Sequence, residues 1–78
     1  MPVFHFHTRI DGHLFEDPDG SELPNLEAAR AEAFAAAREA IAEQIRMGKS
    51  VGGRSFEIAD EAGRILATVT SRDVLKLH

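Results

Sequence analysis

The feature that most constrains the fold is an alanine-rich amphipathic segment, residues 26–47, in the middle of the chain. Its apolar residues recur at the spacing of one helix face, and its charged residues gather on the opposite face. Asn25 suits the N-cap and Gly48 the position just after a helix ends, so we predict a helix over residues 25–47 including its cap. Because alanine dominates the apolar face, we expect the helix to lie close against a sheet. The apolar face consists of Leu26, Ala29, Ala33, Phe34, Ala37, Ala40, Ile41 and Ile45.

Both flanks of this helix carry the signals of β-hairpins. In residues 3–17 apolar and polar residues alternate, and Asp11-Gly12 is a strong turn signal because both positions need a positive φ. In residues 54–70 two strand-like segments are joined by a turn that ends at Gly63. We therefore predict an α+β fold of ββαββ order, in which a four-stranded antiparallel sheet carries one long helix on one face.

The register of the first hairpin predicts which of its side chains share a face. We expect Ile10 to pair with His13 across the turn, since successive side chains of a strand point to opposite faces. Three phenylalanines then lie on the core face, and a mixed set of polar and apolar residues lies on the other. The core set is Phe4, Phe6 and Phe15, and the opposite set is Val3, His5, His7, Arg9, Leu14 and Glu16.

The length of the chain favours one domain, residues 1–78. Residues 71–78 form a C-terminal tail in this interpretation, with a turn at Ser71 and an extended segment from Val74 to Leu77. A core of this size is only marginally stable by itself, and the chain has no cysteine for a disulfide. Oligomerisation is the remaining common source of stability, so we expect a homodimer.

Charge and hydropathy argue against several classes of partner. The net charge of −4 makes nucleic acid an unlikely partner, because nucleic-acid-binding domains usually present a basic face. No apolar run approaches the ~20 residues that cross a bilayer, and the residues from Met1 onward lack the regions of a signal peptide. We therefore expect a cytoplasmic protein that does not contact the membrane.

Motifs that would indicate an enzyme are absent from the sequence. There is no cysteine, no tyrosine and no Gly-x-Ser-x-Gly turn, so no nucleophile stands at a useful spacing from a base. The segment from Val51 to Arg54 contains two glycines, but no helix start follows it as a phosphate-binding loop requires. We interpret it as a flexible joint, and we expect neither catalysis nor a cofactor.

One candidate metal site lies on the first hairpin. His5 and His7 project from the same face of the first strand, and the predicted register places Glu16 opposite His7. Two imidazoles and a carboxylate are ligand types that Zn²⁺ accepts. The alternative is that the histidines are ordinary surface residues or lie in an interface.

The second sheet face is a candidate interaction surface. Leu66 lies on the face opposite to Ile65 and Val69, although a half-exposed strand normally alternates cleanly. Spare apolar residues on that face suggest a small non-enzymatic module that binds protein, either a second copy or an unidentified partner, through this face or an edge strand. The proposed interface comprises Val3, His5, His7, Leu14 and Leu66.

Several segments together resemble a family of short bacterial proteins that is described only as a domain of unknown function. In that family an aromatic–aromatic–His strand precedes an acidic turn, and an Asp-x-x-Gly hairpin follows the helix. In this chain His5 interrupts the aromatic pair, and Ser71 stands where the family has an aromatic or apolar residue. Membership implies no activity. The matching segments are Phe4 to His7, Glu16 to Gly20, Leu26 to Ala33 and Phe56 to Leu66.

The order of hairpin, acidic turn and alanine-rich helix is also distantly similar to HicB-type antitoxins. This similarity implies an alternative function, a regulatory protein that masks a toxin or associates with nucleic acid. Such a role would need a basic partner protein or a local basic cluster, for which the candidates are Arg9, Arg54, Arg64 and Arg72.

Overall fold

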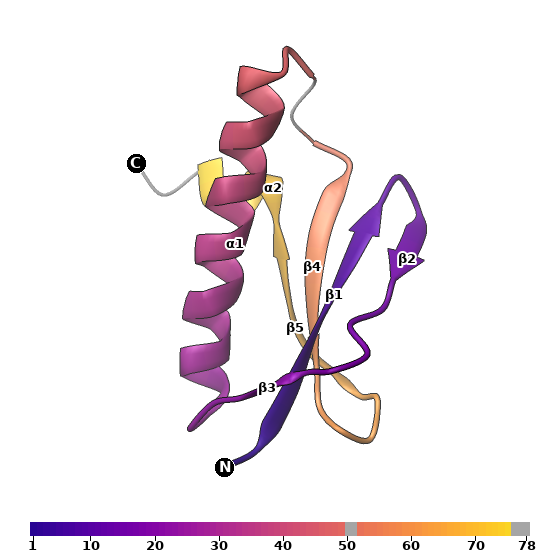
Figure 1. Ribbon diagram of the computed structural model, residues 1–78, viewed down its shortest axis with the longest axis vertical. Helices are drawn as coiled ribbons and strands as arrows, with labels where there is room; N and C mark the ends of the chain where they lie inside the picture. Colours follow the sequence, from indigo (N-terminus) through magenta and orange to yellow (C-terminus); the bar gives the residue numbers. More distant parts are fainter. Residues whose placement is uncertain (50–51, 76–78) are drawn as a thin grey trace.

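The computed structural model describes residues 1–49 and 52–75 and consists of one antiparallel sheet with a long helix on one face (Figure 1). The sheet has five strands in the order β2-β1-β4-β5, with the short β3 pairing with β1 beyond β2. This confirms the predicted α+β class. The elements are β1 (Val3–Ile10), β2 (His13–Phe15), β3 (Ser21–Glu22), α1 (Leu26–Arg46), β4 (Arg54–Ala59), β5 (Ile65–Thr70) and α2 (Ser71–Leu75).

Helix α1 begins and ends where its sequence signals predict. The Asn25 side chain accepts a hydrogen bond of 2.8 Å from the backbone N–H of Ala28, which satisfies one of the free donors of the first turn. Gly48, just after the C-cap residue Met47, has a φ of 71°, which costs glycine little. The helix is 21 residues long, one residue shorter than predicted.

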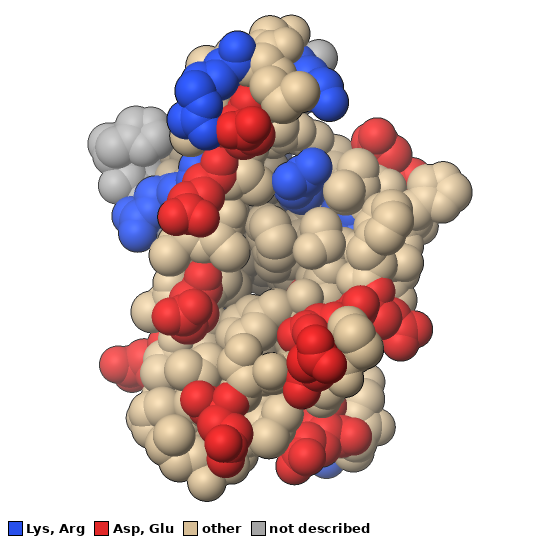
Figure 2. All heavy atoms as spheres, viewed as in Figure 1, with Lys and Arg blue, Asp and Glu red and all other residues tan. Residues whose placement is uncertain are grey.

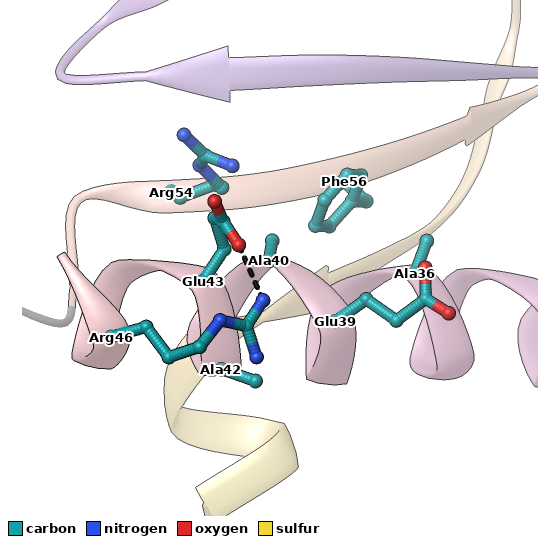
Figure 3. A pocket seen from close by; sticks show the side chains of 8 residues that line it. All are labelled: Ala36, Glu39, Ala40, Ala42, Glu43, Arg46, Arg54 and Phe56. Carbon is teal, nitrogen blue, oxygen red and sulfur yellow. Dashed lines mark hydrogen bonds and ion pairs between the residues drawn. The ribbon is translucent and has the colours of Figure 1, made fainter.

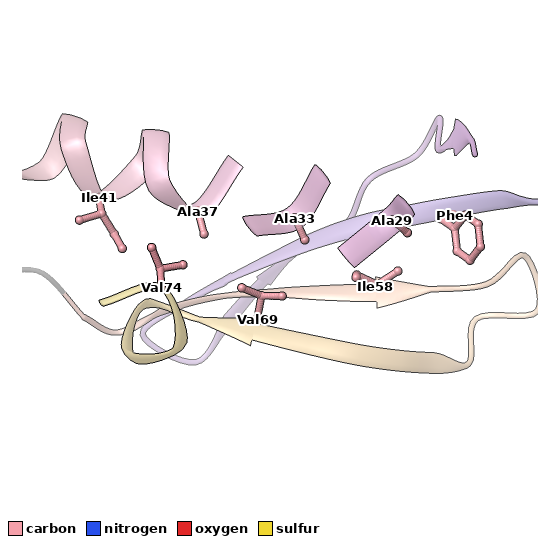
Figure 4. Packing of buried hydrophobic residues seen from close by; sticks show 8 residues of the cluster. All are labelled: Phe4, Ala29, Ala33, Ala37, Ile41, Ile58, Val69 and Val74. Carbon is pink, nitrogen blue, oxygen red and sulfur yellow. The ribbon is translucent and has the colours of Figure 1, made fainter. Parts of the chain in front are cut away.

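The core is a single layer between α1 and the sheet. The helix contributes mostly alanine, so its backbone lies close to the strands, mainly β4 and β5 (Figure 4). The short helix α2 packs against α1 and closes the end of this layer. The buried cluster consists of Phe4, Ala29, Ala33, Ala37, Ile41, Ile58, Val69 and Val74.

The first hairpin has the predicted register but not the predicted burial. Ile10 pairs with His13, and Asp11 and Gly12 have φ values of 49° and 87°, as the turn requires. Phe15 lies on the same sheet face as Phe6, yet its exposed fraction is 57%. The expectation that Phe15 is in the core is wrong. On this face α1 packs mainly over β4 and β5, at the far edge from β2, and therefore does not cover Phe15.

The sheet has one strand more than predicted. Residues Ser21 and Glu22, expected to lead into the helix, run antiparallel to the start of β1 and form β3. The return strand of the first hairpin correspondingly stops at Phe15, because the loop after it turns back along β1. Strands β2 and β3 therefore share one edge of β1.

The C-terminal segment contains a helix that the sequence interpretation missed. The backbone N–H of Asp73 donates to Thr70 Oγ1 at 3.1 Å, and the backbone N–H of Thr70 donates to the Asp73 carboxylate at 2.9 Å. This reciprocal pair is a capping box, which starts α2 directly after β5. The expected extended segment is wrong for Val74 and Leu75, and its last residues lie outside the described part of the chain, as does Val51 of the predicted joint.

Candidate functional site

The two histidines of the predicted metal site lie side by side on the sheet face away from α1. Their rings are stacked with centroids 6.1 Å apart. The backbone N–H of Asp17 donates to His7 Nδ1 at 3.0 Å, and His5 Nδ1 lies 2.9 Å from the carbonyl oxygen of Asp17. A backbone N–H can only donate and a carbonyl can only accept, so Nδ1 carries the proton on His5 but not on His7. Both Nδ1 atoms are therefore used within the hairpin.

Asp17 attaches the acidic loop, Glu16 to Gly20, to β1 by hydrogen bonds. Its carboxylate accepts hydrogen bonds from the backbone N–H groups of Phe6 (3.1 Å), Asp19 (3.2 Å) and Gly20 (3.2 Å). Burial of the carboxylate opposes ionisation, but these three donors and the nearby His5 outweigh it and lower the pKa of Asp17 below 3.8. The role of this residue is therefore structural.

The pairing of β1 with β2 does not place Glu16, the third predicted metal ligand, next to the histidines. Strand β2 ends before Glu16, so His7 has no strand partner on the β2 side, and on the other side of β1 it pairs with Glu57 of β4. Glu57 in turn forms an ion pair of 2.9 Å with Arg9, and this contact raises the pKa of Arg9. Within residues 1–49 and 52–75 no group of three His, Cys, Asp or Glu side chains is placed to hold a metal ion. Metal binding by His5, His7 and Glu16 stays a prediction.

The predicted interface residues do not form one continuous apolar patch. The strand order puts Leu14 on one edge of the sheet and Leu66 on the opposite edge, with exposed fractions of 41% and 37%. Between them lies the Arg9–Glu57 ion pair, and His5 and His7 face the Asp17 loop. The outer sheet face is therefore largely polar at its centre, as is usual for a solvated antiparallel sheet.

The edge at β5 is a clearer candidate surface. Its six residues, Ile65-Leu66-Ala67-Thr68-Val69-Thr70, include no charge, no glycine and no proline. Among the described residues no strand pairs with its outer side. Most proteins protect exposed edges with charge, proline, short length or a bulge. Strand β5 has no charge and no proline, and its pairing with β4 shifts register at Leu66, between the partners of Ile58 and Ala59. The opposite edge strand β2, by contrast, has only three residues.

A groove runs between α1 and β4 on the helix side of the sheet, with a volume of about 670 Å³. Figure 2 shows the molecule hollowed at this position, and Figure 3 shows how the lining side chains lie. The sequence interpretation did not predict it. The alternation of side chains along the strand could have indicated it, because this alternation places Arg54 on the same core-facing side of β4 as Phe56 and Ile58. The lining residues are Ala36, Glu39, Ala40, Ala42, Glu43, Arg46, Arg54 and Phe56.

The charges of the groove are unevenly compensated. Glu43 forms an ion pair with Arg46 one helical turn further along α1. The Nε atom of Arg54 is buried and has no hydrogen-bond partner among the described residues. Buried donors in folded proteins are almost always paired, so the Nε–H of Arg54 is an exception.

Fold and surfaces together define a small α+β domain with an open strand edge and an open groove. The chain belongs to the family described as a domain of unknown function, DUF6894, whose model matches residues 3–72. This confirms the resemblance to a family of short proteins without an assigned function. No curated protein and no solved structure matches the chain significantly, and the similarity to HicB-type antitoxins is not confirmed. Neither helix of the described residues has the length and apolarity to span a membrane.

Proposed function

We propose that this domain is a non-enzymatic protein-interaction module that forms a homodimer through the edge of β5. The observation that supports the proposal is the six-residue edge strand without charge, glycine or proline. Such an edge presents a row of unpaired backbone donors and acceptors, which a further strand can satisfy.

A second copy of the chain suits this edge better than a charged partner strand. Around a two-fold axis β5 pairs antiparallel with itself, so every side chain meets one from the same uncharged set. No like charges of the two strands then lie opposite each other, and Ile65 and Leu66, both exposed in the single chain, gain apolar neighbours. The two sheets become continuous, with both α1 helices on the same face.

The thin core gives a further reason for self-association. Only two large side chains, Ile58 and Val69, are fully buried among the described residues, and alanine supplies much of the rest of the core. Small domains of this kind commonly gain stability by burying additional surface in an oligomer.

Sedimentation equilibrium or light scattering at high micromolar concentration tests the proposal. We expect a mass of twice 8.5 kDa for the unmodified chain. Leu66→Lys places a charge on the proposed edge and should yield a monomer, because a lysine on an edge strand disfavours pairing with a further strand. Leu14→Lys is the matched control, with similar exposure on the same sheet face but on the opposite edge. This control should remain dimeric.

Two results would contradict the proposal. One is a strictly monomeric chain at every concentration measured. The other is equal disruption by Leu14→Lys and Leu66→Lys, which would move the contact to the outer sheet face. Circular dichroism of both variants separates loss of the dimer from loss of the fold.

The regulatory alternative has no specific support. Of the four arginines considered for a basic cluster, Arg9 is paired with Glu57 and Arg64 is paired with Asp60. Figure 2 shows that Asp and Glu side chains are spread over much of the visible face, while Lys and Arg side chains gather mainly near one end.

A further inference from the structure

We propose that, in a dimer of paired β5 edges, the face of α2 that carries Arg72 and Leu75 docks on the start of the partner's β5, where Arg72 forms an ion pair with the partner's Glu61. The inference rests on the proposed homodimer. It adds the side chains by which one copy recognises the other.

The symmetry of the pairing brings opposite ends of β5 together. Helix α2 follows the last residue of β5 directly, and the turn from β4 precedes its first residue, so helix and turn lie at opposite ends of the strand (Figure 1). When a strand pairs antiparallel with itself about a two-fold axis, each of its ends lies beside the other end of the second copy. With the axis near Thr68, position 72 of one copy lies level with residues 63–65 of the partner. Each dimer therefore has two identical contacts between an α2 helix and a turn.

The charges at these two ends are complementary. Glu61 in the turn and Arg72 in α2 are both exposed, and neither forms an ion pair with another described residue. The charges next to them are already engaged, since Arg64 pairs with Asp60 and the Asp73 carboxylate accepts a backbone N–H at the start of α2. Glu61 and Arg72 thus match each other in sign across the two-fold axis.

Each end also carries an exposed apolar side chain near its charge. Leu75 lies three residues after Arg72, so both are on one face of α2, whereas Val74 is buried in the core. Leu75 and Ile65, the first residue of β5, have the same exposed fraction of 46%. Contact between Leu75 and the partner's Ile65 would remove apolar surface from water beside the ion pair.

These groups cannot meet within one chain. The six residues of β5 separate its two ends by about 20 Å, which is too far for an ion pair between Glu61 and Arg72 of the same copy. An exposed ion pair contributes little affinity, but it favours one orientation and one partner over others. An unrelated edge strand would lack both matches, so the contact selects a second copy of this chain.

Native mass spectrometry of mixed charge-reversal variants tests the proposal. Arg72→Glu and Glu61→Arg should each dimerise about tenfold more weakly than wild type, because like charges then face each other at both contacts. When the two variants are mixed, the heterodimer should far exceed random pairing, since each of its contacts again joins opposite charges.

Lys49→Glu is the matched control, because it changes the net charge as Arg72→Glu does but lies just after α1, away from both ends of β5. Mixed with Glu61→Arg, it should pair at random. Random pairing of Arg72→Glu with Glu61→Arg, in conditions where wild type is dimeric, overturns this contact and leaves the β5 dimer in place. A monomeric wild type overturns both.

Neutral variants decide the matter where a charge reversal does not fold. Arg72→Gln and Glu61→Gln each remove the same ion pair, so the double variant should dimerise no more weakly than either single variant. Additive losses in the double variant would show that the two side chains do not interact and would overturn the proposal.

Discussion

At the scale of single residues, Asp17 and its neighbours determine how the acidic loop lies on the sheet. The carboxylate accepts hydrogen bonds from three backbone N–H groups, and the backbone of the same residue forms hydrogen bonds with both histidines of β1. Gly20 completes the arrangement with a φ of 74°, and a Cβ at this position would lie 2.7 Å from Val3 Cγ1. A turn at these residues follows from Asp-Pro-Asp-Gly, whereas its attachment to β1 depends on atoms ten or more residues away.

Asp17→Asn should lower the free energy of unfolding by about 1–3 kcal/mol at neutral pH, since an amide cannot replace both acceptor oxygens of the charged group. The pKa of Asp17 is lowered in the folded chain, so the charged form stabilises the fold above the ordinary value of 3.8. As the pH falls below that value the unfolded chain takes up the proton first, and this stabilisation is lost. Urea denaturation followed by circular dichroism at neutral and acidic pH measures the difference.

The matched control for this change is Asp19→Asn, because Asp19 is exposed and its side chain accepts no hydrogen bond from the part of the chain that the structure describes. It should change stability by less than about 0.5 kcal/mol. A difference between wild type and Asp17→Asn that stays constant down to acidic pH would contradict the assigned role.

At the scale of elements, the alanine face of α1 sets the distance between helix and sheet. Ala29 and Ala33 are completely buried, and Ala37 is nearly so. Side chains this small let the helix backbone approach β4 and β5, which leaves no room for a longer side chain. The prediction of a closely packed helix rested on this composition.

Ala33→Leu should destabilise the fold by about 1–3 kcal/mol, because the added carbons have to displace the sheet. Ala31→Leu is the matched control, since Ala31 is exposed on the same helix and leucine has nearly the helix propensity of alanine. Thermal and urea unfolding of the two variants measures the effect. Equal stability of the two variants would show that the helix does not pack as described.

At the scale of the whole molecule, the strand order decides which surfaces are open. The pairing of β1 with β4 places the two hairpins side by side and leaves β2 and β5 at opposite edges. Helix α1 packs mainly over β4 and β5 on one face of the sheet (Figure 1), and the groove lies between α1 and β4. One strand edge and one groove are thereby left open among the described residues.

If the dimer forms as proposed, the melting temperature should rise with protein concentration, because association stabilises only the folded chain. Leu66→Lys should remove this dependence, and Leu14→Lys should preserve it. Circular dichroism melts over a wide range of dilution provide the measurement. A melting temperature that is independent of dilution in the unmodified chain would speak against a dimer linked to folding.

The sequence by itself determined the central helix with both ends, the turn at Asp11-Gly12, the register of the first hairpin and the α+β class. These features depend on caps, turn residues and periodicity, which act over a few neighbouring residues. The capping box that starts α2 is equally local, and attention to Thr70 and Asp73 would have predicted it.

Only the tertiary structure decided which strands are neighbours and which part of the sheet the helix covers. Those choices exposed Phe15, separated Leu14 from Leu66, and turned Arg54 from a loop-flanking residue into the unpaired donor of a groove. The physical reason is that alternation assigns a side chain to a face but not to a position across the sheet. That position depends on pairing between segments far apart in the chain, and local patterns do not encode it.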